Sequence, residues 1–411
     1  MIDLNKKYSF ININGTTFKN FSRYSTISTK KNVSSFFKKE ILGVSNGKVF
    51  FYGAARMGIY EFIKSLNLKK GDEVAVTAFT CSVVINSIKR FNLNVKYIDI
   101  DKKTLGTSFI DLKSKISKKT KLIIAQHSFG IPCDIDKIVN FAKSKKILVL
   151  EDCAISILST LDNKRVGTFG DASIFSFDHT KPLNCFVGGA LYLKNKELIK
   201  KLNASYKEIE SISPEKTKKM ILRHNFEIKF CNYNNSIIYF ILNKLLTFYY
   251  KISCSPYLDE DINLSKLKNQ SYPYPSLMPI FAFNCLKQSI TNYKKKIKLN
   301  NQKLNTFIKY FKYKKIEGID HYLSLKRRKI HPFRFVWLNN GINNLSYLSK
   351  KIDINQIWFK QVVINTSKSS KYYGYKSNSC KNSENICKKI INIPNTIPKN
   401  KITKLLANIY E

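Results

Sequence analysis

Two neighbouring stretches decide the fold, LEDCAISIL at residues 150–158 and FGDASIFSFDHTKPLNCFVGGALYL at residues 169–193. The first stretch ends an apolar run at two acids, Glu151 and Asp152, which predicts a strand buried on both faces of a parallel sheet. The second stretch contains another apolar run, and Lys181 follows it. Because open α/β sheets bind ligands at the carboxyl ends of their strands, we expect the acid and the lysine to converge at one edge of the sheet.

An acid and a lysine at one edge suit the chemistry of pyridoxal phosphate. A lysine amine can form a Schiff base with the aldehyde of this cofactor, and a carboxylate keeps the pyridine nitrogen protonated so that the ring can act as an electron sink. A structural alternative stays open for each residue. Lys181 could be a solvated surface lysine, and Asp152 could cap the following helix.

The residues around these two positions resemble the DegT/StrS family of sugar aminotransferases, which belongs to the fold-type-I superfamily of pyridoxal-phosphate enzymes. The motifs that carry the resemblance are EDCA at 151–154, FGDASIFSFDHTK at 169–181 and VGGALYL at 187–193. The resemblance is close over residues 48–195 and weaker over 276–411. It implies that Lys181 holds the cofactor covalently, that Asp152 pairs with the pyridine nitrogen, and that Ser176 hydrogen-bonds the phosphate.

A short turn that leads into a helix offers a second contact with the phosphate. The sequence AARMGI at residues 54–59 stands where the family has SGTAAL or SGRAAL. Free backbone amides and the helix dipole attract anions to such a helix start. The resemblance therefore implies that Ala55, Arg56 and Met57 border the cofactor phosphate, and the alternative is an ordinary helix start.

Three further residues are candidates for contact with the cofactor ring. Most of the family has an aromatic ring where Cys81 stands. Either Phe79 substitutes for that ring, or the polarizable sulfur of Cys81 packs on the pyridine. His127 follows a predicted strand and either contacts cofactor or substrate or is bonded to nearby backbone for structural reasons.

The resemblance implies an aminotransferase that uses pyridoxal 5'-phosphate to place an amino group on a keto sugar, with a nucleotide-linked sugar expected. Such an enzyme would serve the biosynthesis of surface polysaccharide or another glycan, with glutamate as the amino donor. Two positions depart from the family. This chain has Ile155 where the family has a glutamine after EDAA, and it has Val187 where the family has the glutamate of TGEGG.

Two other functions stay open. The first is a related pyridoxal-phosphate enzyme of another reaction type, such as a sugar dehydratase, in which a histidine replaces the lysine. Lys181 argues against it, although His179 lies nearby in the sequence. The second is a non-catalytic regulator or anion-binding protein on the same scaffold, and the joint presence of Asp152, Ser176 and Lys181 argues against it.

Alternating strand and helix patterns predict an α/β fold with a doubly wound, mostly parallel sheet. We expect three parts: a polar, irregular N-terminal segment at 1–47, a large cofactor-binding domain at 48–275 with an inserted apolar segment at 232–254, and a long linking helix with a smaller C-terminal α+β domain at 276–411.

The amino-acid composition limits which binding partners and which cellular compartment we expect. The 411 residues include 71 Lys and Arg against 28 Asp and Glu, a formal net charge of +43. Most of this charge is lysine spread over the whole length, as an AT-rich genome would produce, so nucleic acid is not expected as the main partner. Nine cysteines without a CxxC pair predict reduced thiols and no metal site. The N-terminal sequence MIDLNKKYSF lacks the pattern of a secretion signal, and we expect a cytoplasmic protein.

The resemblance implies a homodimer, because the cofactor sites of this superfamily lie at the subunit interface. The segment SIIYFILNKLLTFYY at 236–250 is too short for the roughly 20-residue span of a membrane helix. As a helix it would carry one polar strip through Asn243, Thr247 and Lys251 and a broad apolar surface. That surface is either buried, in the dimer or under the small domain, or it lies in a membrane interface with the lysines near anionic lipid.

Overall fold

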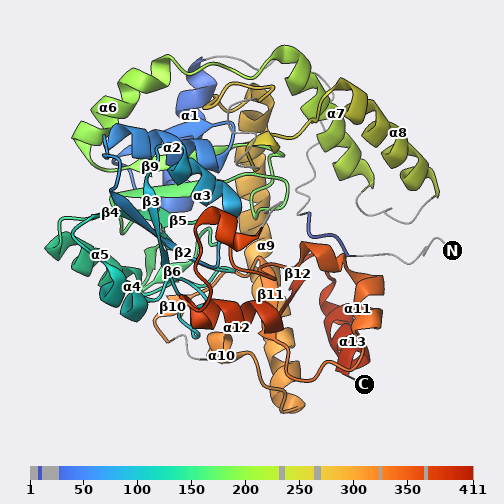
Figure 1. Cartoon of the computed structure of the whole chain (residues 1–411). Helices are drawn as coiled ribbons and strands as arrows, with labels where there is room; N and C mark the ends of the chain where they lie inside the picture. Colours follow the sequence, from blue (N-terminus) through green and yellow to red (C-terminus); the bar gives the residue numbers. More distant parts are fainter. Residues whose placement is uncertain are drawn as a thin grey trace.

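The computed structural model of the protein describes residues 8–11, 27–230, 237–262, 270–323, 326–364 and 369–410 (Figure 1). A seven-stranded sheet lies at its centre, and β9 is antiparallel to both of its neighbours while the other paired strands run parallel. The mostly parallel α/β sheet expected from the sequence is thereby confirmed. The strands in spatial order are β1 (Lys48–Tyr52), β9 (Gly189–Leu193), β8 (Ala172–Ser176), β5 (Leu148–Asp152), β4 (Thr120–Gln126), β2 (Glu73–Thr77) and β3 (Asn94–Ile98).

The register of the central strands decides which side chains share a face. Asp152 of β5 pairs with Gln126 of β4 and with Ile174 of β8. Successive side chains of a strand point to opposite faces of the sheet. Asp152, Gln126 and Ser176 therefore lie on one face, and Glu151 lies on the other.

Helices cover both faces of the sheet. On the face of Asp152, α2 approaches so closely that a Cβ atom added at Gly58 would lie 2.7 Å from Cδ1 of Ile174. On the face of Glu151, the ring of Phe37 in α1 packs edge-on against Phe175 with 5.2 Å between centroids. The helices on the first face include α2 (Ala55–Ser65) and α3 (Ser82–Lys89), and those on the second include α1 (Ile27–Phe37), α4 (Phe109–Lys115) and α5 (Ile135–Ser144).

The helix α1 and the π-helix η1 (Lys38–Leu42) were not expected, because the N-terminal segment is polar and irregular in composition. Four apolar side chains explain their position. Val33 and Phe37 of α1 and Ile41 and Leu42 of η1 are buried in the main core. These few contacts fix the segment on the sheet even though most of its residues are polar.

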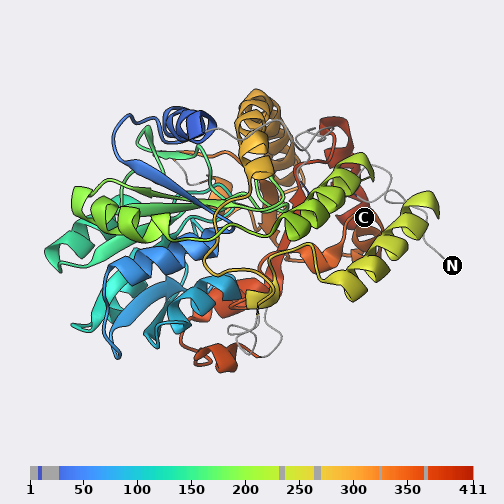
Figure 2. The same cartoon turned by 90° about the horizontal axis from the view of Figure 1, so that it is seen from above.

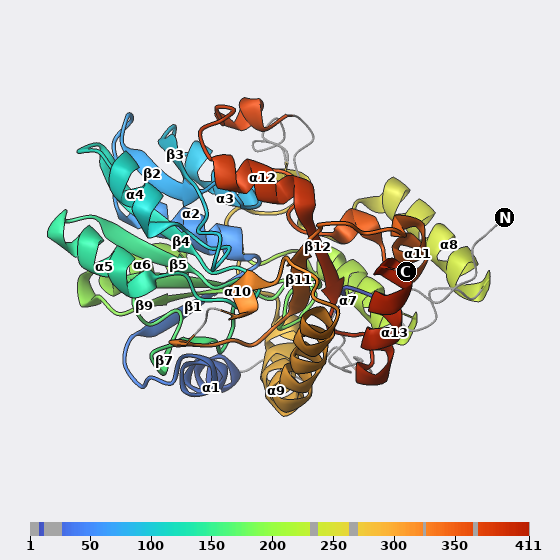
Figure 3. The same cartoon turned by 90° about the horizontal axis from the view of Figure 1, so that it is seen from below.

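The C-terminal part of the chain has a second hydrophobic core (Figure 3). The long helix α9 (Ile280–Tyr313) lies between the sheet and this part, in which β11 (Arg334–Leu338) pairs antiparallel with β12 (Ile390–Pro394). Phe10 belongs to the same core, so the two ends of the chain meet there. The remaining elements around these parts are α10 (Asp320–Leu323), α11 (Leu345–Lys351), α12 (Lys381–Lys389), α13 (Lys399–Tyr410) and a small sheet of β10 (Arg328–Lys329), β6 (Thr160–Leu161) and β7 (Lys164–Arg165).

Three helices follow the main sheet, α6 (Lys196–Lys207), α7 (Pro214–Phe230) and α8 (Ile237–Ser253), and α8 lies at the outer edge of the molecule (Figure 2). Asn243 and Tyr250 face the protein: Arg223 donates a 2.9 Å hydrogen bond to Asn243, and the Tyr250 hydroxyl donates one of 3.3 Å to the Lys219 carbonyl. The opposite side of α8 exposes a set of large apolar side chains, Phe240, Ile241, Leu242, Leu245, Phe248, Tyr249 and Ile252.

This arrangement corrects one detail of the expectation for α8. Its apolar surface is not buried under the C-terminal part, because the helix contacts the body of the protein through the side that holds Asn243. Thr247 and Lys251, expected on one polar strip with Asn243, are exposed. In the parts of the chain that the structure describes, every helix falls short of the length and apolarity needed to cross a membrane.

A buried carboxylate attaches the C-terminal part to the main sheet. Asp99 follows β3 and is 7% exposed. Its carboxylate accepts hydrogen bonds from the backbone N–H groups of Asn382 and Ser383 at 2.8 and 2.7 Å and from the Ser383 hydroxyl at 2.6 Å. It thereby satisfies free amides in the first turn of α12 from outside the helix.

We therefore predict that Asp99→Ala lowers the free energy of unfolding by about 2 kcal/mol, because it leaves buried donors without acceptors. Urea unfolding followed by circular dichroism measures this. The control Glu208→Ala changes an exposed acid and should stay within about 0.5 kcal/mol of the unchanged protein. Equal stability of the two variants would contradict the role of Asp99.

Candidate active site

A cavity of about 550 Å³ opens at the carboxyl ends of β4, β5 and β8. Strands that are distant in sequence end at this point, so their following residues meet there. The structure brings six of the residues predicted from the sequence to the wall of this cavity: Ala55, Arg56, Cys81, Asp152, Ser176 and Lys181.

The amine of Lys181 lies in the interior of this cavity against an aromatic ring. Its Nζ atom is 4.1 Å from the centroid of the Trp358 ring. Burial lowers the pKa of the amine, although nearby Asp178, Cys81 and Asp152 favour the charged form. A lysine with a lowered pKa carries a larger neutral fraction and is a better nucleophile and base.

Asp152 is a buried acid on the same wall. The residue is 8% exposed, and its Oδ1 atom accepts a 3.0 Å hydrogen bond from the Ala154 N–H. Burial raises the pKa of the carboxyl group, and the Ala154 amide and the charge of Lys181 oppose that rise. A cationic group bound in the cavity would stabilise the ionised form further.

Asp178 and His179 form a pair beside the lysine, and both line the cavity. Asp178 accepts hydrogen bonds from the Thr180 N–H at 3.0 Å and from the Thr180 hydroxyl at 2.7 Å, and its other oxygen lies 3.5 Å from Nδ1 of His179. Burial would lower the pKa of His179, but Asp178 raises it to about 9. His179 is therefore a cation engaged with Asp178 at neutral pH.

The first turn of α2 forms another wall. A Cβ atom at Gly189 would lie 2.4 Å from the backbone nitrogen of Ala55, so glycine is required for β9 to pass this close to the helix start. Burial would lower the pKa of Arg56, but the carboxylate of Asp261, 2.5 Å away, raises it. The Arg56 guanidinium is thus occupied by an ion pair with Asp261.

Two predicted residues lie behind the wall of the cavity. Met57 is fully buried, and its sulfur accepts hydrogen bonds from the N–H and the hydroxyl of Ser276, both at 3.3 Å. Phe79 is fully buried, with its ring centroid 4.4 Å from that of Phe359. Of the two alternatives for the ring contact, Cys81 is the residue that lines the cavity, and Phe359 is an aromatic residue there that the sequence did not indicate.

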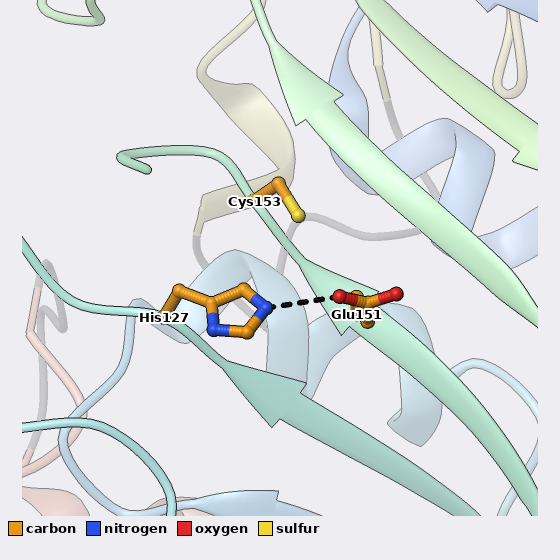
Figure 4. A group of neighbouring side chains, drawn as sticks. All are labelled: His127, Glu151 and Cys153. Carbon is orange, nitrogen blue, oxygen red and sulfur yellow. Dashed lines mark hydrogen bonds and ion pairs between the residues drawn. The ribbon is translucent and has the colours of Figure 1, made fainter. Parts of the chain in front are cut away.

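His127 lies on the opposite face of the sheet, in contact with Glu151 (Figure 4). The Cys133 N–H donates to Nδ1 of His127 at 3.2 Å, so Nε2 carries the proton and donates to Glu151 at 3.1 Å. Because the preceding residue Gln126 points into the cavity, strand alternation turns the histidine away from it. The geometry matches the structural alternative given for His127.

His127, Glu151 and Cys153 are also the one group of three potential metal ligands found among the described residues. The Glu151 carboxylate already accepts hydrogen bonds of 2.6 to 2.7 Å from three backbone N–H groups, those of Gly167, Phe169 and Gly170. Nδ1 of His127 is occupied as well. These atoms satisfy one another in the core, which is the usual state of buried polar groups, and we assign them a structural role.

Besides Phe359, reasoning from the sequence missed Gln126, Trp358 and Arg334. Gln126 has a signal that could have found it, because its strand parallels that of Asp152 and it occupies the matching position. Trp358 and Arg334 come from the C-terminal part of the chain. Only the tertiary structure brings them to the cavity.

Comparison with known proteins finds a family and several relatives that this chain resembles. Residues 53–244 match the model of the DegT/DnrJ/EryC1/StrS aminotransferase family. The GDP-perosamine synthase of Escherichia coli O157:H7 is 38% identical over 155 residues, which is 38% of this chain and 40% of that protein. The GDP-4-keto-6-deoxy-D-mannose 3-dehydratase of Yersinia pseudotuberculosis is 37% identical over 137 residues, 33% of this chain and 35% of that protein. The aligned part thus spans less than half the length of these relatives.

Solved structures match over nearly the whole chain. The PLP form of the Streptococcus pneumoniae protein Spr1654 has a TM-score of 0.68 at 14% identity, covering 95% of this chain and 92% of that one. A mutant GDP-4-keto-6-deoxymannose-3-dehydratase with bound GDP-perosamine has a TM-score of 0.64 at 18% identity, covering 93% and 92%. These likenesses show a shared fold. Residues 53–244, which contain Asp152, Ser176 and Lys181, are thus similar to the DegT/DnrJ/EryC1/StrS aminotransferase family.

Proposed function

We propose that the protein is a pyridoxal-phosphate-dependent aminotransferase that places an amino group on a keto sugar, specifically a nucleotide-linked sugar used for surface polysaccharide or another glycan. The observation that carries this proposal is the presence of Lys181 and Asp152 in one cavity at the end of the sheet. The likeness to GDP-perosamine synthases supports the nucleotide-linked acceptor. Glutamate as the amino donor is what the family resemblance implies.

The residues of the cavity fit the cofactor. A half-buried amine of lowered pKa is available at Lys181, and a buried carboxylate is available at Asp152. Ser176 and the first turn of α2, which begins at Ala55, offer a hydroxyl and backbone amides to the phosphate. When bound, pyridoxal phosphate supplies an electron sink for the substrate carbon that loses or gains a proton.

The side chains would divide the work of the reaction. Lys181 would hold the cofactor and, once an amino donor has released it, its neutral amine would take a proton from the donor carbon and return one at the cofactor's aldehyde carbon. Asp152 would keep the pyridine nitrogen protonated. Trp358 and Phe359 line this cavity with aromatic rings, and apolar walls strengthen the interactions of charged groups beside them.

A sugar dehydratase is the second candidate, because dehydratases are among the relatives and His179 lines the cavity. In that branch of the family a histidine takes the place of the lysine. Here Lys181 is present, and His179 is engaged with Asp178. These two observations favour the aminotransferase.

The same proposal includes two features of assembly. We propose a homodimer, as the family resemblance implies. We also propose that the exposed side of α8 contacts an anionic membrane surface, which would place this cytoplasmic enzyme at the inner face of a membrane. Large apolar residues cover that side, α8 contains Lys244 and Lys251 but no acid, and the chain carries a net charge of +43. A second copy would bring the same positive charge, whereas anionic lipid complements it.

The first prediction concerns the covalent link. Borohydride reduction of the purified yellow protein, followed by peptide mapping, should find a pyridoxyl group on Lys181, because its amine is the cavity nucleophile with a lowered pKa. Lys181→Met should lose the label, while Lys194→Met, a change of a lysine outside the cavity, should keep it. A label on another lysine, or none, would refute the mechanism.

The adjacent acids allow a matched pair of variants. Asp152→Asn should leave the protein folded and cut turnover by at least about a hundredfold, because the pyridine nitrogen loses its charged partner. Glu151→Gln should instead lower thermal stability, since the Glu151 carboxylate accepts three backbone N–H groups in the core. Steady-state rates and thermal melts measure both. Near-normal transamination by Asp152→Asn would remove Asp152 from its assigned role.

Vesicle flotation tests the surface of α8. The intact protein should float with anionic vesicles at low salt, and changing Ile241, Leu245 and Phe248 together to Ser should abolish flotation. The matched control changes Ile110, Tyr313 and Leu345, which are exposed elsewhere, and should float normally. If the intact protein does not float with the vesicles, the lipid contact is wrong. If light scattering shows that the α8 variant turns a dimer into a monomer, the lipid contact is also wrong, because a second copy of the chain then covers α8.

A further inference from the structure

Arg334, the first residue of β11, is a buried cation on the wall of the cavity that holds Lys181. The residue is 1% exposed. Its guanidinium lies between two aromatic rings, with Cζ 3.8 Å from the centroid of Trp358 and 4.3 Å from that of Phe10. These contacts hold the guanidinium in a fixed orientation, as cation–π contacts do.

Only part of the guanidinium has partners within the described chain. Nη1 donates hydrogen bonds to the carbonyl of Gln356 at 2.6 Å and to Oδ1 of Asn392 at 2.9 Å. Nε and Nη2 are buried and have no hydrogen-bond partner among the residues that the structure describes. Burial accordingly lowers the pKa of Arg334.

Arg334 forms no ion pair with an acid in the described ranges of the chain, and a buried guanidinium without a counter-charge is costly to the fold, so its presence needs a reason. The two free atoms suggest one. Nε and Nη2 form the edge of the guanidinium that can donate two parallel hydrogen bonds to a carboxylate. We propose that this edge of Arg334 binds the carboxylate of the amino donor.

The position of Arg334 indicates that its ligand is the amino donor and not the sugar acceptor. Arg334 and Lys181 contact the same Trp358 ring. In an α-amino acid, the amine and the carboxylate are attached to one carbon, so a carboxylate site beside the lysine amine places the donor amine at the reacting position. In a nucleotide-linked sugar, the diphosphate is attached to the anomeric carbon, which is not the keto carbon. That group therefore lies farther from the reacting position.

This inference rests on the proposed function and names how its first substrate is held. Two variants test it. Arg334→Met removes the charge at similar length, and Arg334→Lys keeps the charge but loses the two-pronged geometry. The control Arg327→Met changes an exposed arginine that pairs with Asp136 and Asp162.

Calorimetric titration of the cofactor-loaded protein with glutarate, a dicarboxylate that cannot react, gives a readout independent of turnover. We expect glutarate to bind at least about thirtyfold more weakly to Arg334→Met and about tenfold more weakly to Arg334→Lys, as the loss of charged hydrogen bonds predicts. The KM for glutamate should rise in parallel, and the KM for the sugar acceptor should not change. Arg327→Met should behave like the unchanged protein.

The outcomes separate this inference from the proposed function. Unchanged glutarate affinity in Arg334→Met would overturn the carboxylate site, and so would a loss of affinity for guanosine diphosphate in place of glutarate. Borohydride labelling of Lys181 should persist in Arg334→Met, so failure of the carboxylate site leaves the cofactor assignment intact. If Arg334→Met does not fold, as judged by circular dichroism, Arg334→Lys decides the matter by the same titration.

Discussion

The alternation of side chains along β5 is the constraint on which the site depends. Glu151 and Asp152 are neighbours in the sequence, yet they face opposite sides of the sheet. Glu151 accepts backbone N–H groups in the core and organises the residues that follow β5. The Asp152 side chain lies on the other face of the sheet, where it lines the cavity. A shift of the register by one residue would exchange the two acids, and the cavity would lose its carboxylate.

The second half of the site comes from the C-terminal part of the chain. Lys181 Nζ and Arg334 Cζ lie 4.1 and 3.8 Å from the centroid of the same Trp358 ring, so one indole sets the relation between the two basic groups. Positive charge on both groups is unfavourable without bound anions. The proposed cofactor and donor would supply those charges, which explains why the cavity combines a lysine of lowered pKa with an arginine whose Nε and Nη2 have no acceptor among the described residues. Some stability of the empty protein is given up for binding.

Much of the sheet and part of the site could be predicted from the sequence because they depend on local patterns. Apolar runs that end in polar residues located β5 and β8, and the motifs around Lys181 located the cavity. Other features depend on tertiary contacts. Four buried side chains hold α1 and η1, whose segment looks irregular, and Arg334 reaches the cavity only through the packing of β11. Met57, Phe79 and His127 lie near the predicted place but behind its wall, since the direction of a side chain depends on strand and loop geometry that motifs do not specify.

The central claim is that Asp152 and Lys181 hold pyridoxal phosphate between them. A crystal structure of the protein with the cofactor tests it most directly. We predict electron density that is continuous with Nζ of Lys181, a ring nitrogen within hydrogen-bond distance of the Asp152 carboxylate, and a phosphate at Ser176 and the first turn of α2. A cofactor bound elsewhere, or in this cavity with its ring nitrogen away from Asp152, would contradict the account.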